Sequence, residues 1–171
     1  MTVVGLVSDT HLPRFGRALP RALERGFREA GVSRILHMGD FTEPLAAELF
    51  EAIAPFDAVA GNNDGRELRD RFGRKKIVTI EDARIGMVHG DAGRGATLQN
   101  ALDAFAGERL AAICFGHSHR PLIERRGEML VVNPGSPTDK RMNPRYSYGI
   151  MRVDGGAVSA ELKFYFDRRI D

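Results

Sequence analysis

Short apolar runs alternate with helical patterns in the first third of the chain, and this alternation restricts the folds that the chain can adopt. The predicted strands in this part are residues 3–8, 34–38 and 57–60. Between them, apolar residues recur at helical spacing over residues 19–30 and 45–53. Strand, helix and strand in this order predict a parallel sheet with right-handed crossovers.

Residues that start and stop helices support these boundaries. Gly31 follows the first helical pattern at a position typical of a C-cap. Thr42 and Pro44 supply start signals for the second helix, and Pro55 ends it.

The second half of the chain contains more predicted strands and fewer helices. The predicted strands are residues 77–80, 84–88, 111–115, 129–132, 147–153 and 158–166, and the predicted helix is residues 98–105. The first two of these strands are close enough in sequence to form a hairpin. Asp154-Gly155-Gly156 is a hairpin turn before the last strand, in which apolar and polar residues alternate. We therefore predict one mixed α/β domain over residues 1–171.

Composition excludes several classes of protein. The chain of 171 residues is 43% hydrophobic and 28% charged, as in a soluble globular domain, and its net charge of +2 is too small to indicate nucleic-acid binding. Its one cysteine, Cys114, excludes an internal disulfide framework and favours a reducing compartment. The N-terminus lacks the pattern of a signal peptide, and no apolar run reaches the ~20 residues that span a bilayer. We predict a cytoplasmic protein without a membrane partner.

Five short segments combine metal-ligand residue types with glycine or with one another. They are Asp9-Thr10-His11, Gly39-Asp40, Gly61-Asn62-Asn63-Asp64, His89-Gly90-Asp91 and Gly116-His117-Ser118-His119. Four of the five histidines of the chain lie in them. Each segment follows an apolar run, which places its side chains at the carboxyl end of a predicted strand, where open α/β sheets bind ligands. Glycine before Asp40, Asn62 and His117 allows tight turns.

These side chains have the chemistry of a metal centre with two ions. Two carboxylates, four imidazoles and one amide oxygen are available, and Asp40 is the natural bridge between ions ~3.5–4 Å apart. Ligands rich in imidazole favour Mn, Fe, Zn or Ni over Mg or Ca. Two divalent ions with two carboxylates and one hydroxide leave a net charge of about +1, which attracts a phosphate ester and activates water for its hydrolysis.

The order Asp-x-His, Gly-Asp, Gly-Asn, His-Gly and Gly-His-x-His resembles the calcineurin-like metallophosphoesterase superfamily. The chain length and the runs Asn133-Pro134-Gly135-Ser136 and Ser147-Tyr148-Gly149 are similar to its small prokaryotic phosphodiesterase branch. The resemblance implies a four-layer αββα sandwich of two mixed sheets flanked by helices, often in a homodimer or larger homo-oligomer. It implies that one ion is held by Asp9, His11, Asp40 and His119. It implies that the other is held by Asp40, Asn62, His89 and His117.

Asn63 departs from the pattern of this family. Many members have histidine at this position, where it protonates the leaving group, and the small branch often has cysteine. An asparagine amide can donate a hydrogen bond but cannot act as a general acid near neutral pH. We therefore predict that Asn63 favours substrates with good leaving groups.

Other polar residues have competing interpretations. We predict that His37 is a packed structural histidine, that Asp91 belongs to a turn, and that Cys114 is buried and inert. Asp64 is a candidate catalytic-site residue that could orient a histidine or cap the following segment. The Asn133–Ser136 run could be only a tight turn after a strand, whereas the resemblance implies that it packs near the metal centre, and no chemical role is assigned to it.

Basic residues near the motifs are candidates for contacts with a substrate phosphate. They are Arg14, Arg120 and Arg141, although solvated surface arginines are commoner. The run Arg74-Lys75-Lys76 is predicted to be an exposed loop, because it lacks the aromatic residues that accompany a nucleic-acid site.

The favoured interpretation is a dinuclear phosphodiesterase that acts on a small phosphate ester, with manganese as the first choice of metal. The alternative from another class is a non-catalytic scaffold on the same fold, as the retromer subunit resembling this superfamily is. A phosphomonoesterase is also open, whereas the short chain disfavours a nuclease.

Overall fold

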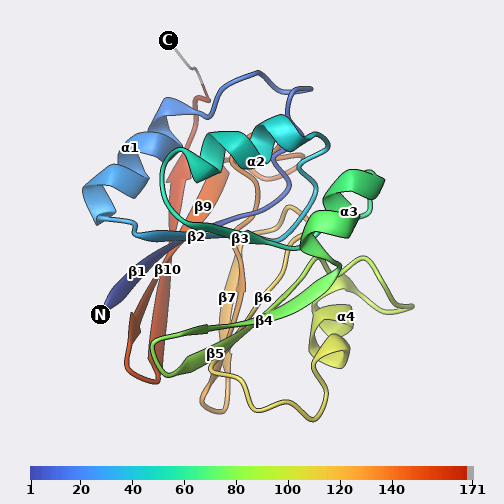
Figure 1. The fold of residues 1–171 in the computed structure, drawn as a ribbon, viewed down its shortest axis with the longest axis vertical. Helices are drawn as coiled ribbons and strands as arrows, with labels where there is room; N and C mark the ends of the chain where they lie inside the picture. Colours follow the sequence, from blue (N-terminus) through green and yellow to red (C-terminus); the bar gives the residue numbers. More distant parts are fainter. Residues whose placement is uncertain (169–171) are drawn as a thin grey trace.

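Two five-stranded β-sheets form the centre of the computed structural model, which describes residues 1–168 (Figure 1). The first sheet has the order β10-β9-β1-β2-β3. Its strands are β1 (Thr2–Val7), β2 (Arg34–His37), β3 (Phe56–Ala58), β9 (Tyr146–Asp154) and β10 (Ala157–Tyr165). The second sheet has the order β4-β5-β6-β8-β7. Its strands are β4 (Lys75–Ile80), β5 (Ala83–Val88), β6 (Ala112–Cys114), β7 (Leu122–Arg126) and β8 (Met129–Asn133).

Four helices cover the outer sides of the two sheets. They are α1 (Arg21–Ala30), α2 (Pro44–Glu51), α3 (Arg66–Phe72) and α4 (Thr97–Ala104). In α1, α2 and α3, the buried residues Phe27, Phe50 and Phe72 belong to one apolar cluster with the first sheet. Phe105, which directly follows α4, packs with Ile113 of the second sheet.

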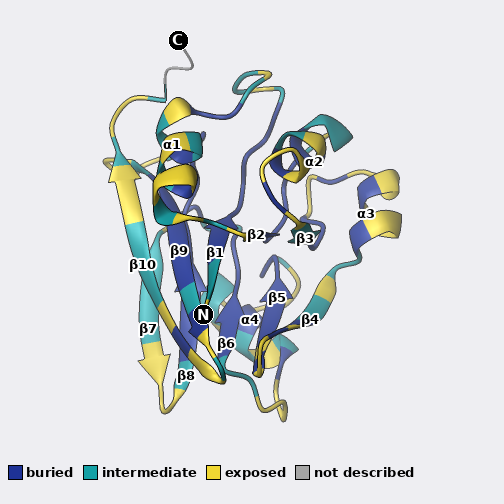
Figure 2. Ribbon diagram, turned by 60° about the vertical axis from the view of Figure 1, so that its left-hand side comes forward, coloured by how far each residue is buried: buried dark blue, intermediate teal, exposed yellow. Residues whose placement is uncertain are grey.

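A third apolar cluster lies between the sheets and completes a four-layer arrangement. Leu6 and Met151 of the first sheet pack there with Ile85, Met87 and Val132 of the second. Figure 2 shows the strands of this middle region as buried, whereas the helices expose one side. The predicted αββα sandwich is therefore confirmed.

Both sheets contain neighbouring parallel strands. β1 pairs with β2 and β2 with β3 in parallel, which confirms the predicted βαβαβ order. In the second sheet, β5, β6 and β8 are parallel neighbours. The antiparallel strands β9 and β10 continue the first sheet, while β4 and β7 form the edges of the second.

Two elements were not predicted from the sequence. Most residues of α3 are charged, and its seven residues bury only Leu68 and Phe72, which is too little to establish a helical period. β7 is an edge strand without a fully buried residue. The prediction of a loop at Arg74-Lys75-Lys76 was wrong for its last two residues, because they begin β4 and pair with β5.

Two further local predictions need correction. Thr42 is not the N-cap of α2, because Glu43 occupies that position and Thr42 has a φ of 79°. The regular alternation of β10 does not extend to its end, where Phe164 and Phe166 are 39% and 77% exposed. Their rings lie outside the apolar clusters, and the Arg145 guanidinium is 4.2 Å from the centre of the Phe164 ring.

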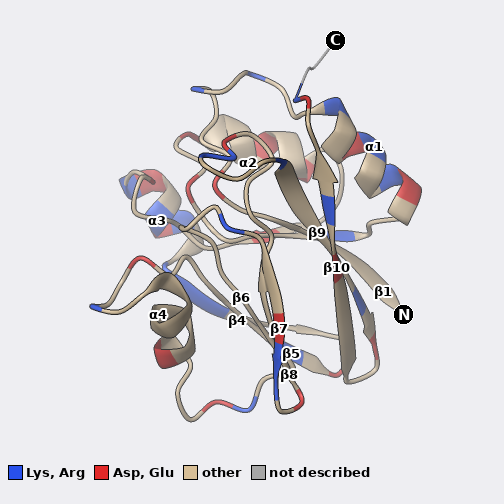
Figure 3. Ribbon diagram, turned by 180° about the vertical axis from the view of Figure 1, so that it is seen from behind, with Lys and Arg blue, Asp and Glu red and all other residues tan. Residues whose placement is uncertain are grey.

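Charged residues of both signs share the surfaces of α1 and α3 (Figure 3). The pairs Arg25–Glu29 (3.8 Å) and Arg66–Asp70 (3.4 Å) neutralise part of the basic charge on these helices. Among residues 1–168, no helix is both long enough and apolar enough to cross a bilayer.

Candidate metal centre

The loops that follow parallel strands of both sheets bring the predicted ligand residues together. Asp9 follows β1, Asp40 follows β2 and Asn62 follows β3, all in the first sheet. His89 directly follows β5, and His117 lies shortly after β6 in the second sheet. The predicted position at the carboxyl ends of strands is therefore confirmed, and the centre lies where these ends of the two sheets meet.

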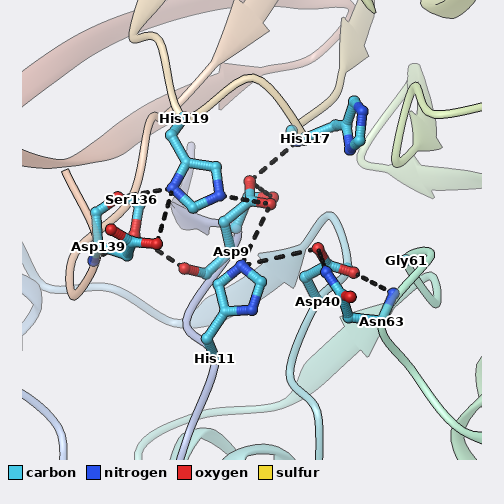
Figure 4. A network of polar contacts seen from close by, with 12 residues as sticks. Asp9, His11, Asp40, Gly61, Asn63, His117, His119, Ser136 and Asp139 are labelled. Atoms are coloured by element: carbon cyan, nitrogen blue, oxygen red, sulfur yellow. Dashed lines mark hydrogen bonds and ion pairs between the residues drawn. The ribbon is translucent and has the colours of Figure 1, made fainter. Parts of the chain in front are cut away.

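One group of ligand atoms comes from Asp9, His11 and His119 (Figure 4). Asp9 Oδ1 is 3.4 Å from His119 Nε2 and 4.0 Å from His11 Nε2. Within residues 1–168, these three buried atoms are the ones that lack a hydrogen-bond partner. Leaving buried polar atoms unpaired costs free energy, so three such atoms that face one another fit a bound cation.

The other oxygen of Asp9 is occupied by hydrogen bonds. Asp9 Oδ2 accepts one from the Ser8 hydroxyl at 2.7 Å and one from the His117 backbone N–H at 3.0 Å. These bonds fix the carboxylate so that Oδ1 faces the histidines.

A second group surrounds Asp40 and His89. His89 Nε2 is 3.3 Å from Asp40 Oδ2 and 3.8 Å from Asp9 Oδ1, so the three side chains form another set of candidate ligands. The side-chain oxygen of Asn62 is 3.1 Å from both His89 Nε2 and His117 Nδ1. The predicted set of Asp40, Asn62, His89 and His117 is thus continuous in space.

Both carboxylates lie between the two groups. Asp40 Oδ2 is 3.6 Å from His11 Nε2, a nitrogen of the first group, and Asp9 belongs to both groups. The geometry therefore allows either carboxylate to bridge two ions, whereas the sequence pointed to Asp40 alone.

The backbone holds many of these side chains in a rarely populated conformation. Eight described residues other than glycine have positive φ, and five of them are candidate ligands. These five are Asp9 (57°), His11 (45°), Asp40 (60°), His117 (66°) and His119 (57°). Such strain is typical of functional sites, where the surrounding structure holds the backbone in place.

The glycines before the ligands act mainly by allowing close approach. Only Gly39 of the three has positive φ, at 96°. A Cβ on Gly61 would lie 2.1 Å from Asp40 Oδ1, and one on Gly116 would lie 1.9 Å from Ser8 Oγ. Any larger residue at either position would displace the carboxylate of Asp40 or the Ser8–Asp9 pair.

Hydrogen bonds to the far side of two imidazoles orient their Nε2 atoms. His119 Nδ1 donates to the backbone oxygen of Asp139 at 2.6 Å, and His89 Nδ1 donates to that of Met38 at 2.6 Å. Neutral imidazoles that donate in this way present the lone pair of Nε2 to the centre, as ligands of metals do.

The two carboxylates of the site favour positive charge at His89. Burial raises the pKa of Asp9 to about 7, although His89 and Ser8 oppose this change. Burial alone would lower the pKa of His89, but its contact with Asp40 and the charges of both carboxylates raise it to about 9. Burial opposes ionisation of Asp40 too, yet the contacts with His89 and Asn63 hold its pKa well below the usual range. The two carboxylates therefore stabilise the protonated form of His89.

A family model of the calcineurin-like phosphoesterase superfamily domain matches residues 1–156. The chain belongs to this superfamily. A probable metallophosphoesterase of Methanothermobacter thermautotrophicus is 36% identical over 163 residues, which cover 94% of this chain and 91% of that protein. A phosphodiesterase of Methanocaldococcus jannaschii is 28% identical over 146 residues, or 77% of this chain and 82% of that protein.

Solved structures share the calcineurin-like fold. Vps29 of Chaetomium thermophilum has a TM-score of 0.73 at 18% identity, and the match covers 96% of this chain and 97% of Vps29. An archaeal phosphodiesterase has a TM-score of 0.70 at 24% identity, with 95% of this chain and all of that chain covered (100%). At these identities the likeness shows a common fold.

Within this calcineurin-like site, Asn63 contacts Asp40 through both its backbone and its side chain. Its backbone N–H donates to Asp40 Oδ1 at 2.9 Å, and its side-chain amide donates to Asp40 Oδ2 at 2.8 Å. The side chain is exposed, so it lies at the open side of the centre.

Asp64 binds backbone groups of the ligand loops. Its Oδ2 accepts hydrogen bonds from the N–H groups of Asp40 (2.8 Å) and Gly61 (2.7 Å). Its Oδ1 accepts one from Thr42 at 2.8 Å. Asp64 is therefore a positioning residue for Asp40, a role that differs from both orienting a histidine and capping the segment that follows.

The loop after β8 supports the centre in a way that the sequence did not reveal. The Ser136 hydroxyl donates to the Asp9 backbone oxygen at 2.8 Å, and that of Thr138 donates to Thr10 at 2.6 Å. The Asn133 amide donates to the Gly116 backbone oxygen at 3.0 Å. The expectation that residues 133–136 pack near the centre is confirmed, while the contributions of Thr138 and Asp139 carried no recognisable sequence signal.

Three other residues singled out in the sequence, His37, Cys114 and Asp91, lie outside the candidate ligand groups. His37 is fully buried, stacks on Phe41 with ring centres 3.9 Å apart, and lies 3.1 Å from the Thr10 hydroxyl, as expected of a packed histidine. Cys114 is buried, as predicted. Asp91 lies outside regular structure and pairs with Arg74.

Proposed function

We propose that this chain is a dinuclear metal-dependent phosphodiesterase that hydrolyses a small phosphate ester. The observation that carries the proposal is the set of unpaired, buried ligand atoms of Asp9, His11 and His119 beside a second group around Asp40 and His89. Membership of the calcineurin-like superfamily supports the same chemistry.

Each candidate ligand has a specific place in this proposal. One ion would be held by Asp9, His11, Asp40 and His119, and the other by Asp40, Asn62, His89 and His117. Manganese is the first expectation, with Ni, Fe or Zn also suited to these ligands. Two such ions, when bound, would supply positive charge to the phosphoryl oxygens and would lower the pKa of a water molecule.

The residues of the chain prepare the site for this chemistry. Asp64 and Ser136 hold the backbone of the two carboxylate loops, while Asp139 and Met38 orient His119 and His89. Ligands fixed before the substrate arrives need no reorganisation during the reaction.

Asn63 limits the range of esters that can be cleaved. Its amide is committed to Asp40 by a 2.8 Å hydrogen bond and has no proton to transfer to a leaving group. We expect the rate to fall steeply as the leaving-group pKa rises across a series of aryl diesters. Asn63→His supplies a general acid and is expected to flatten this dependence. A flat dependence in the wild-type protein would contradict the role given to Asn63.

The function is tested by comparing esters and metals. Protein treated with a chelator and reloaded with Mn, Ni, Fe, Zn or Mg is assayed on bis(4-nitrophenyl) phosphate and on 4-nitrophenyl phosphate. We expect turnover with Mn, and faster cleavage of the diester than of the monoester. Asp40→Asn removes a candidate bridging carboxylate and is expected to lower kcat/KM by about 10³-fold.

A matched control separates loss of the centre from a general effect of charge. Asp70→Asn makes the same change at an exposed carboxylate of α3 and is expected to leave turnover unchanged. Metal-independent turnover, or equal activity of Asp40→Asn and wild type, would overturn the proposal. Absence of turnover by the reloaded wild-type protein on every diester would favour the scaffold alternative.

A further inference from the structure

A tight turn after β8 lies directly against His119. The turn is closed by a hydrogen bond from the Asn143 backbone N–H to the Lys140 backbone oxygen at 2.9 Å. The Asn143 side-chain amide donates to the His119 backbone oxygen at 2.8 Å, and His119 Nδ1 donates to Asp139 on the other side of the turn. Residues 139–143 therefore have a fixed position beside one candidate ligand.

Arg141 occupies a strained position within this turn. Its φ is 49°, a conformation that is costly for a residue with a side chain. Its backbone N–H donates to Asp139 Oδ1 at 3.3 Å, which helps to hold this conformation. The side chain is exposed, and within residues 1–168 its guanidinium forms no ion pair with a carboxylate.

The charge of Arg141 reaches histidines from two different loops. Burial lowers the pKa values of His11, His117 and His119, and the positive charge of Arg141 lowers each of them further. His11 follows β1, whereas His117 and His119 follow β6. The turn itself lies beside the centre, because Asp139 and Asn143 on either side of Arg141 both contact His119.

The other two candidate arginines lie in different surroundings. The Arg14 guanidinium is 5.2 Å from the centre of the Phe15 ring, where a cation–π contact occupies it. Arg120 lines an apolar hollow with Leu98, Phe115 and Leu122 on the side of α4. Of the three candidate arginines, Arg141 is therefore the best placed to meet an anion at the metal centre.

We propose that Arg141 binds a non-bridging oxygen of the substrate phosphoryl group and thereby determines affinity for the ester. This inference rests on the proposed function. A guanidinium donates charge-assisted hydrogen bonds to phosphate oxygens in a fixed geometry, which a surface lysine reproduces poorly. Such a contact is present both before and during the reaction, so its loss raises KM more than it lowers kcat.

The test compares Arg141→Ala with Arg145→Ala in the manganese-loaded protein. Arg145 is in the same loop and carries the same charge, but its guanidinium lies against Phe164 on β10. For bis(4-nitrophenyl) phosphate, we expect Arg141→Ala to raise KM about tenfold with a change in kcat below about twofold, and Arg145→Ala to change neither. Arg141→Lys should give an intermediate KM, and guanidinium ion added to Arg141→Ala should lower its KM again.

A binding measurement provides a readout that does not depend on turnover. Titration calorimetry with inorganic phosphate should show a Kd about tenfold higher for Arg141→Ala than for wild type, with equal manganese content in both proteins. An unchanged Kd and KM in Arg141→Ala, or equal losses in Arg145→Ala, would overturn the inference while leaving the phosphodiesterase proposal intact. A wild-type protein without manganese-dependent turnover would instead overturn the proposed function.

Discussion

Asp64 shows how one carboxylate can position candidate metal ligands through the backbone of their loops. It accepts hydrogen bonds from the backbone of Asp40, Gly61 and Thr42, so it joins the loops that follow β2 and β3. The sequence placed it near the centre because it ends the Gly61–Asp64 segment. Its actual role depends on three backbone N–H groups that no sequence pattern locates.

Replacing Asp64 by Asn should weaken metal binding. The side-chain NH₂ of the asparagine would face a backbone N–H group, and two donors cannot form a hydrogen bond with each other. At least one of the three hydrogen bonds is therefore lost, and the Asp40 loop loses its fixed position. We expect the Kd for manganese to rise about 10- to 100-fold in calorimetric titrations. Asp70→Asn on α3 serves as the control and should bind manganese as the wild-type protein does. Equal affinity in both variants would show that Asp64 does not position the ligands.

His37 predicts a specific dependence of stability on pH. Burial holds its pKa well below the ordinary value of 6.5, so the folded state stays neutral where the unfolded state binds a proton. The unfolded state therefore binds more protons below pH ~6.5, and the free energy of unfolding falls as the pH is lowered. His37→Gln removes this titration. It should reduce the slope of the free energy of unfolding against pH, between pH 5 and 6, by up to about 1.4 kcal/mol per pH unit. Urea unfolding at both pH values measures the slope, and identical slopes in variant and wild type would contradict the prediction.

At the scale of the elements, strands and helices with a clear apolar period could be predicted from the sequence. The strands β1, β2, β5 and β9 carry long buried runs, and each was placed within one or two residues. By contrast, α3 and β7 are stabilised by contacts with the rest of the fold, and their own residues are largely charged or partly exposed. Tertiary packing outweighs local propensity in such elements.

The candidate site was more predictable than the elements that support it. Ligand residue types after apolar runs placed five of the predicted ligands at the ends of strands, and His11 and His119 lie two residues beyond Asp9 and His117. The loop over residues 133–143 approaches Asp9 and His119 from far along the chain, through hydrogen bonds such as that from Ser136. The position of residues 133–136 near the centre was predicted, but the hydrogen bonds of the loop were not, because hydroxyl and amide donors in a loop have no characteristic spacing.

The turn at Gly61 should tolerate no side chain. In Gly61→Ala, the new Cβ would lie 2.1 Å from Asp40 Oδ1, so the carboxylate has to move. We expect the free energy of unfolding to fall by about 1–3 kcal/mol and manganese binding to weaken. Gly65→Ala is the matched control four residues away, where a Cβ meets nothing within 4 Å. Denaturant unfolding measures the free energy of unfolding of both variants. Equal values for Gly61→Ala and Gly65→Ala would show that a Cβ at position 61 does not displace Asp40.

At the scale of the whole molecule, the two sheets enclose a core that also protects the single thiol. Cys114 lies in β6 with its side chain in the cluster between the sheets, and burial raises its pKa to about 12. A neutral, inaccessible thiol reacts poorly with disulfide reagents. We expect no reaction with an aromatic disulfide reagent in the native protein at pH 8 and one equivalent after unfolding in guanidinium chloride.

An exposed thiol provides the control for this measurement. Thr79 is exposed on β4 of the same sheet, so Thr79→Cys should add one rapidly reacting equivalent in the native state. Rapid reaction of the wild-type protein under native conditions would mean that the sheets separate more readily than the packing indicates.

The proposed function depends on loops from both sheets that bring two groups of candidate metal ligands together. Anomalous scattering from a crystal soaked in manganese tests it directly. The account predicts two peaks ~3.5–4 Å apart, one beside Asp9, His11 and His119 and the other beside Asp40 and His89. A map without a peak between these side chains, in a crystal where they keep the positions described, would contradict it.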